Sequence, residues 1–199
     1  GLDPALQPVT DEGVLTAVQQ KYHLTPPYLL FLSTVQPRKN LVRLIRAYAA
    51  SGLPHQLVLA GKSGWLAQPI LAEVARHPDS IALPGFIDDA DKAALLSGAE
   101  AFLYPSLYEG FGFPLLEAQV CGVPVLAANT SSLPEIAGDS ALLVDPLDTA
   151  AMTAALQRLV QDQTLRSRLI GRGYENVGRF TWRETAVRAL DLLENGPGS

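Results

Sequence analysis

The strongest chemical signal in the sequence is a pair of glutamates, Glu109 and Glu117, which flank a loop containing Gly110 and Gly112. Glycines let a ligand approach the backbone closely, and free N–H groups at the start of a helix attract phosphate. A carboxylate beside a bound phosphate is unfavourable unless it accepts hydrogen bonds from hydroxyl groups. The pattern therefore indicates a ligand that carries both phosphate and sugar hydroxyls, as a nucleotide sugar does.

The surrounding residues predict a strand, a loop and a helix. Residues 101–104 form an apolar run of strand type, and glycine and proline interrupt residues 105–112. Pro114 suits the first turn of a helix, where its missing N–H would have no partner, and Gly122 is expected to end that helix. From spacing alone, a tight turn in which Glu109 merely caps a helix is an equally good interpretation.

The segment from Glu109 to Glu117 resembles the Glu-x7-Glu motif of retaining family-4 glycosyltransferases, which have the GT-B fold. The resemblance covers almost the whole chain and favours the nucleotide-sugar interpretation. It implies that Glu117 accepts hydrogen bonds from ribose hydroxyls and that Glu109 orients the transferred sugar. It also implies that the amides of Gly110, Phe111 and Gly112 bind the donor diphosphate.

A basic pair, Arg38 and Lys39, follows a buried strand predicted at residues 28–33. Ligands of open α/β sheets bind at the carboxyl ends of the strands, although two basic loop residues are more often simply solvated. Family-4 glycosyltransferases, which the chain resembles, hold the donor diphosphate with an arginine and a lysine in this loop. Lys39 matches the family lysine. Ser33 and Thr34 stand where the family has Gly-Arg, so Arg38 would supply the guanidinium from a neighbouring position.

Three more residues are assigned to the donor site by the resemblance. Lys62 follows a strand predicted at residues 56–60, and Phe86 and Ile87 follow one predicted at residues 80–85. The resemblance implies that the backbone of Phe86 and Ile87 contacts the nucleobase and that the Phe86 ring closes one side of its pocket. From the residues alone, Lys62 would be solvated and Phe86 would belong to the core.

Strands and helices are predicted to alternate about six times, and the strands are continuously apolar. We therefore expect an α/β fold, a Rossmann-like open parallel sheet of about six strands with helices on both faces. The resemblance makes it one half of a GT-B fold. Residues 28–180 would form the nucleotide-sugar-binding domain, residues 1–27 a linker and helix leading from an absent N-terminal domain, and residues 181–199 a C-terminal helix and tail.

Two helix starts show a capping pattern, in which the first hydroxyl residue bonds to the backbone amide of the fourth residue. The two pairs are Ser132 with Glu135 and Thr181 with Glu184. The helix after Thr181 has an apolar face, which would join the core or, by resemblance to GT-B enzymes, pack on the first domain. That face comprises Trp182, Val187, Leu190 and Leu193.

Composition narrows the function classes. The chain has 199 residues and a net charge of −5, so it lacks the excess of positive charge that is typical of nucleic-acid-binding proteins. Its one cysteine, Cys121, excludes an internal disulfide framework and fits a reducing compartment. No stretch is long and apolar enough for a membrane helix, and no metal-ligand cluster is evident. We expect no metal or cofactor and a cytoplasmic location, with peripheral association at the inner membrane surface left open.

The resemblance implies a hexosyltransferase that retains anomeric configuration, without a covalent enzyme intermediate. Our first interpretation of the donor is GDP-mannose, because the loop at residues 37–40 and the turn at residues 133–135 look like those of bacterial mannosyltransferases. The acceptor would be a saccharide or lipid-linked saccharide. Two alternatives remain: a donor-binding module that is inactive on its own, and a non-catalytic α/β protein that keeps the motif.

Overall fold

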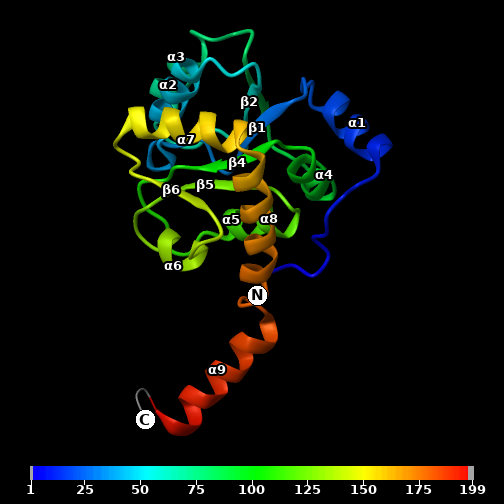
Figure 1. Cartoon of the computed structure of the whole chain (residues 1–199), viewed down its shortest axis with the longest axis vertical. Coiled ribbons are helices and arrows are strands. Elements are labelled where there is room, and N and C mark those ends of the chain that lie inside the picture. Colours follow the sequence, from blue (N-terminus) through cyan, green and yellow to red (C-terminus); the bar gives the residue numbers. More distant parts are fainter. Residues whose placement is uncertain (1, 197–199) are drawn as a thin grey trace.

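Six parallel strands form a single open sheet in the computed structural model, which describes residues 2–196 (Figure 1). The strand order is β3-β2-β1-β4-β5-β6, as the Rossmann-like prediction requires. The prediction of an open, parallel α/β sheet is therefore confirmed. The strands are β1 (Tyr28–Leu32), β2 (Gln56–Ala60), β3 (Ile81–Gly85), β4 (Ala101–Tyr104), β5 (Val125–Ala128) and β6 (Leu142–Val144).

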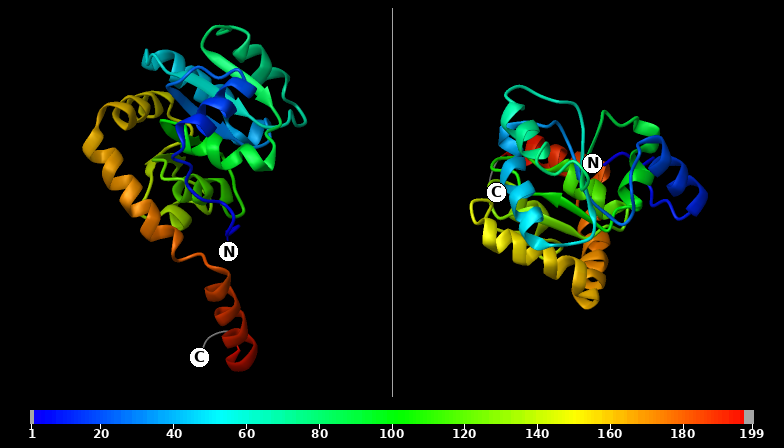
Figure 2. Two further views of the ribbon diagram at one scale, coloured as in Figure 1. Left: turned by 90° about the vertical axis from the view of Figure 1, so that its right-hand side faces the viewer. Right: turned by 90° about the horizontal axis from the view of Figure 1, so that it is seen from above.

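Helices cover both faces of the sheet (Figures 1 and 2). One face carries α2 (Leu41–Ser51), α3 (Gln68–Val74) and α7 (Thr149–Gln161). The other carries α4 (Lys92–Ser97), α5 (Phe113–Val120) and α8 (Gln163–Val177), and α1 (Glu12–Lys21) packs on α4. The shorter elements are η1 (Pro37–Lys39), η2 (Asp89–Asp91) and α6 (Leu133–Ala137), and α9 (Trp182–Asn195) comes last.

The central strands are apolar throughout because both of their faces are covered. Tyr28, Leu30 and Phe31 of β1 and Phe102 of β4 are completely buried. In the register between β1 and β4, Leu30 lies opposite Phe102. The strand order reverses between these two strands, so their carboxyl ends open a crevice where ligands of such sheets bind.

The loop and helix after β4 follow the prediction closely. Pro114 lies in the first turn of α5, and Gly122 follows its end with a φ of 73°. Gly112 precedes the helix with a φ of 117°, and a Cβ atom there would come within 2.8 Å of the Leu133 side chain. Glycine thus suits this backbone conformation, and any side chain here would also displace the end of the Leu133 side chain.

The last helix, α9, projects away from the rest of the described chain (Figure 1). Its apolar side chains are exposed, up to 83% for Leu193, so the interpretation that they join the core is wrong. What covers them stays a prediction, as does the division at residues 28 and 181. Of the expected tail, residues 197–199 lie outside the described part of the chain.

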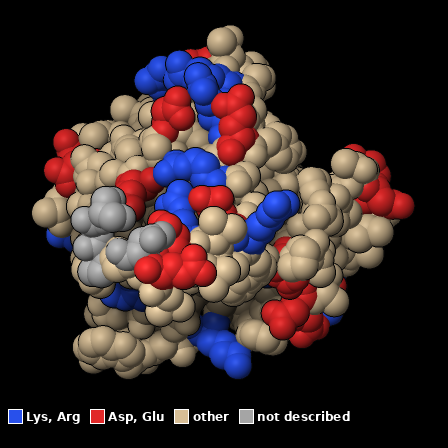
Figure 3. Space-filling model, turned by 90° about the horizontal axis from the view of Figure 1, so that it is seen from below, with Lys and Arg blue, Asp and Glu red and all other residues tan. Residues whose placement is uncertain are grey.

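Charged side chains of both signs are interspersed on the face from which α9 projects (Figure 3). Such mixing gives this face no strongly basic field. Within residues 2–196, no helix has the length and apolar character needed to cross a membrane.

Candidate functional site

Loops that follow β1 and β4 meet at the crevice. The Leu107 amide donates a hydrogen bond of 2.9 Å to the Arg38 carbonyl. The Asn40 side chain donates to the carbonyls of Pro105 and Pro146, at 3.1 Å and 2.7 Å. Asn40 has a left-handed backbone conformation, with a φ of 61°, that turns η1 into α2. The bonds to Leu107 and Pro105 fix residues 37–40, here called the basic loop, against residues 105–112, here called the motif loop.

The predicted residues Lys39, Arg38 and Glu109 form one ion-pair cluster. The Lys39 Nζ atom lies 2.7 Å from Glu109 Oε1, and Arg38 Nη1 lies 2.9 Å from Glu109 Oε2. Lys39 is only 3% exposed and also donates a 2.7 Å hydrogen bond to the Tyr104 hydroxyl. The crevice therefore holds two cations that share one buried carboxylate.

Burial and charge oppose each other in this cluster. Burial acts to raise the pKa of Glu109, but the contacts with Lys39 and Arg38 outweigh it and hold that pKa below its ordinary value. Burial lowers the pKa of Lys39, and the bond to Glu109 offsets only part of this effect. Burial also raises the pKa of Tyr104, which stays a neutral phenol. Glu109 is thus an ionised carboxylate whose charge is balanced by its neighbours.

The backbone amides of Gly110, Phe111 and Gly112 donate no hydrogen bond within the described chain. They directly precede α5, whose dipole favours an anion at this end. The amide of Glu109, in contrast, is already bonded to the Ser131 hydroxyl at 3.0 Å. Three consecutive free donors therefore lie beside the cation cluster.

A cavity of about 430 Å³ lies beside the cluster and is lined by four other predicted residues, Lys62, Phe86, Ile87 and Glu117. Phe86 is 55% exposed, and the Lys62 Nζ atom lies 4.5 Å from the centre of its ring. The interpretation of Phe86 as a core residue is therefore wrong. Ile87 is buried and contributes to one wall.

Glu117 has a partner that the sequence analysis missed. Lys92, at the start of α4, places its Nζ atom 2.5 Å from Glu117 Oε1. Asp89 also lines this cavity and was not predicted either. Both follow β3 in a charged stretch whose side chains could equally have been solvated, so their types carried no signal for the site.

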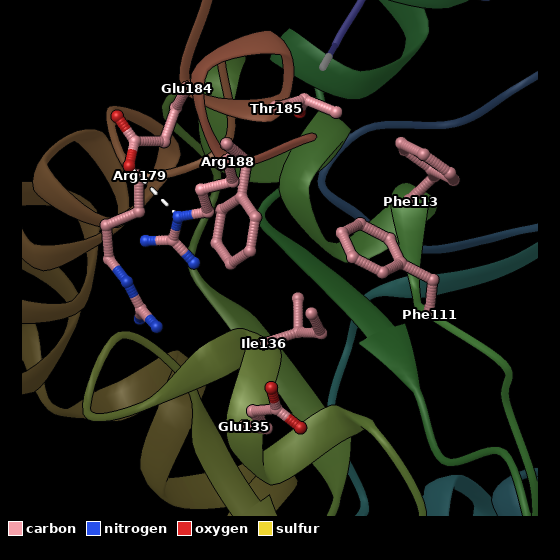
Figure 4. Close-up of a pocket in the computed structure, with 9 residues that line it drawn as sticks. Phe111, Phe113, Glu135, Ile136, Arg179, Glu184, Thr185 and Arg188 are labelled. Atoms are coloured by element: carbon pink, nitrogen blue, oxygen red, sulfur yellow. Dashed lines mark hydrogen bonds and ion pairs between the residues drawn. The ribbon is translucent and has the colours of Figure 1, made fainter. Parts of the chain in front are cut away.

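The predicted site residues form two groups near the start of α5: those that line the 430 Å³ cavity and those of the ion-pair cluster. Arg38, Lys39 and Glu109 do not line the 430 Å³ cavity. Phe113 lines that cavity and also a second pocket of about 270 Å³, which Phe111 joins. In the second pocket, Arg188 of α9 and Phe111 reach toward the middle from different elements (Figure 4). The motif loop thus separates two hollows.

Comparison with known proteins decides the family. The sequence profile described as glycosyl transferases group 1 matches residues 17–176. The chain belongs to this family. The Glu-x7-Glu resemblance is thereby confirmed: the chain is the C-terminal domain of a GT-B glycosyltransferase.

Several curated relatives of this glycosyltransferase domain are named mannosyltransferases. O-antigen chain mannosyltransferase B of Escherichia coli is 36% identical over 184 residues, which cover 89% of this chain and 48% of the relative. The serotype-specific mannosyltransferase WbdA of Escherichia coli is 32% identical over 191 residues, covering 89% of this chain and 23% of the relative. The domain therefore spans half or less of these proteins.

Solved structures share the fold. Sucrose-phosphate synthase from Thermosynechococcus elongatus aligns with a TM-score of 0.79 at 28% identity, covering 95% of this chain and 49% of that protein. Anabaena Alr3699/HepE, solved in complex with UDP and glucose, aligns with a TM-score of 0.85 at 19% identity over 98% of this chain and 55% of its own. The second similarity shows the fold alone.

Proposed function

We propose that this domain binds the nucleotide-sugar donor of a hexosyl transfer that retains anomeric configuration. The observation that carries the proposal is the cluster of Lys39 and Arg38 beside the unbonded amides of residues 110–112. Together they can neutralise a diphosphate. Their interaction strengthens as negative charge develops on the leaving diphosphate, so it lowers the barrier rather than only tightening binding.

The nucleoside part of the donor would occupy the 430 Å³ cavity. Glu117 would accept hydrogen bonds from the ribose hydroxyls, and Lys92 would hold its carboxylate in place. The exposed ring of Phe86 offers a flat apolar surface for the base. Glu109 would contact the hydroxyls of the transferred sugar, next to the diphosphate.

GDP-mannose is the donor that we favour. Relatives named mannosyltransferases support the sugar. Asp89 in the cavity wall supports the base, because guanine presents two adjacent N–H donors that one carboxylate can accept, whereas uracil presents a single N–H. No metal is needed in this proposal, since lysine, arginine and backbone amides balance the diphosphate charge.

The proposal also covers the acceptor, the remaining domain and the location of the whole protein. We expect a saccharide or lipid-linked saccharide acceptor, a further domain that completes the acceptor side, and a cytoplasmic enzyme that works at the inner membrane surface. Because the domain spans 48% of O-antigen chain mannosyltransferase B, a donor-binding module without transfer activity of its own is the second candidate.

Calorimetric titration with GDP, UDP and ADP, and then with the matching nucleotide sugars, tests donor binding. Binding of one diphosphate supports the proposal and identifies the base. Lys39→Met and Glu117→Gln should each weaken that binding at least tenfold. Glu175→Gln, on the exposed surface of α8, is the matched control and should leave it unchanged. Equal binding by all four proteins, or none by the unmodified chain, would contradict the proposal.

A further inference from the structure

The capping pattern at Ser132 does not cap its helix. At Thr181 the hydroxyl accepts the Glu184 amide at 3.1 Å, as the pattern predicts. At the start of α6, however, the Ser132 side chain makes no capping hydrogen bond, so that prediction is wrong. The Ser132 Oγ atom lies instead 3.0 Å and 2.8 Å from the carbonyl oxygens of Glu109 and Phe111, which share its one O–H donor. The Ser132 hydroxyl thus bonds to the motif loop and does not stabilise the start of its own helix.

The two preceding residues contact the same loop. Ser131 Oγ accepts the Glu109 amide at 3.0 Å. Thr130 Oγ1 lies 3.3 Å from the carbonyls of both Ser106 and Leu107. Ser131 is held at a φ of 53°, a conformation that is uncommon for a residue with a side chain. Three consecutive hydroxyl residues, 130–132, therefore hold the motif loop from residue 106 to residue 111.

We propose that Thr130, Ser131 and Ser132, here called the hydroxyl clamp, are positioning residues for Glu109 in donor recognition. This inference rests on the proposed function. The clamp bonds both the N–H and the C=O of Glu109, which fixes the peptide units on either side of its Cα atom. The side chain then leaves the backbone in one direction, toward Lys39 and Arg38.

The clamp also decides which amides remain free for an anion. It uses the Glu109 amide and leaves those of residues 110–112 unbonded. A displacement of the loop would move both the carboxylate and these amides. Because a shift of about 1 Å in a positioning group can cost roughly 100-fold in function, small changes in the clamp should be measurable.

Titration with GDP-mannose and GDP tests the clamp through Ser132→Ala and Ser131→Gly. Glycine removes the hydroxyl while accepting the positive φ, so its effect reports the lost bond rather than strain. In both variants we expect the affinity for GDP-mannose to fall about tenfold, within the range that mispositioning produces. The affinity for GDP should fall less, because Glu109 acts on the sugar. Ser132→Thr, which keeps a hydroxyl at this position, should retain most of the affinity that Ser132→Ala loses.

Thr181→Ala is the matched control, because it removes a hydroxyl that does cap its helix, outside both groups of predicted site residues. It should leave both affinities unchanged. An unchanged ratio of GDP-mannose to GDP affinity in Ser132→Ala and Ser131→Gly would overturn the inference, as would a failure of Ser132→Thr to recover binding.

Amide hydrogen exchange of residues 105–113, followed by mass spectrometry, tests the clamp without any ligand. Ser132→Ala should exchange at least several-fold faster there, while the peptides of β1 and β4 keep their rates. If the unmodified chain binds neither probe, the proposed function fails. The exchange then decides separately whether the hydroxyls hold the loop, and unchanged exchange would overturn the clamp.

Discussion

Lys39 and Glu109 are 70 positions apart in the sequence, and their Nζ and Oε1 atoms lie 2.7 Å apart in the structure. Lys39 is almost fully buried, so its positive charge depends on this carboxylate for balance, while the neighbouring Arg38 cation opposes that charge. A donor diphosphate would bring new negative charge to the same cations. The site is thus already built around the charges that we assign to donor binding.

Removal of one partner from this pair should destabilise the fold. Lys39→Met leaves the Glu109 carboxylate buried with Arg38 alone, and losing one member of a buried pair costs about 3 kcal/mol. Lys39→Met combined with Glu109→Gln should regain a large part of that loss, because no buried unpaired charge remains: the one charge left without a partner, Arg38, is 39% exposed. Urea unfolding of the single and double variants measures both effects. Additive losses would show that the two side chains do not interact in solution.

The pKa of Glu109 predicts a dependence of stability on pH. Its folded-state pKa is lowered, since the contacts with Lys39 and Arg38 overcome the effect of burial. A lowered pKa means that the carboxylate contributes stability above its ordinary value of 4.5 and loses that contribution as the pH falls through the folded-state pKa. Glu109→Gln should therefore flatten the acidic limb of a stability curve measured by thermal unfolding.

The control for this curve is Glu175→Gln, because the Glu175 side chain is 71% exposed. It should keep the acidic slope of the unmodified chain. Other carboxylates with lowered pKa values, such as Glu73 and Asp91, contribute to that slope in every variant. The informative quantity is hence the difference between the Glu109→Gln curve and the others.

Local pattern was enough to predict the sheet and the strand–loop–helix around the motif. Apolar runs such as residues 28–32 mark strands buried on both faces, and Pro114 and Gly122 mark the ends of α5. The link between Lys92 and Glu117 could not be predicted, because it depends on how α4 and α5 pack. Likewise, a Ser-x-x-Glu pattern cannot show that the Ser132 hydroxyl bonds to carbonyls of the motif loop and not to an amide of its own helix.

Donor binding should be independent of divalent metal. Arg38, Lys39 and the free amides supply the positive charge that a metal ion would otherwise bring to a diphosphate. Titration with GDP should give the same affinity in excess EDTA and in added Mg²⁺ or Mn²⁺. An affinity that falls at least tenfold in EDTA and returns with one of these ions would contradict the proposed site.

Asp89 should control the choice of base. It lines the nucleoside cavity, whereas its neighbour Asp88 pairs with Lys21 and does not line it. Asp89→Ala should lower GDP affinity roughly tenfold, the cost of about one charge-assisted hydrogen bond, and leave UDP affinity nearly unchanged. Asp88→Ala is the matched control and should alter neither. Titration of the three proteins with GDP and UDP measures the preference directly. If Asp89→Ala weakens both diphosphates equally, the carboxylate supports the cavity but does not read the base, and GDP-mannose loses its structural support.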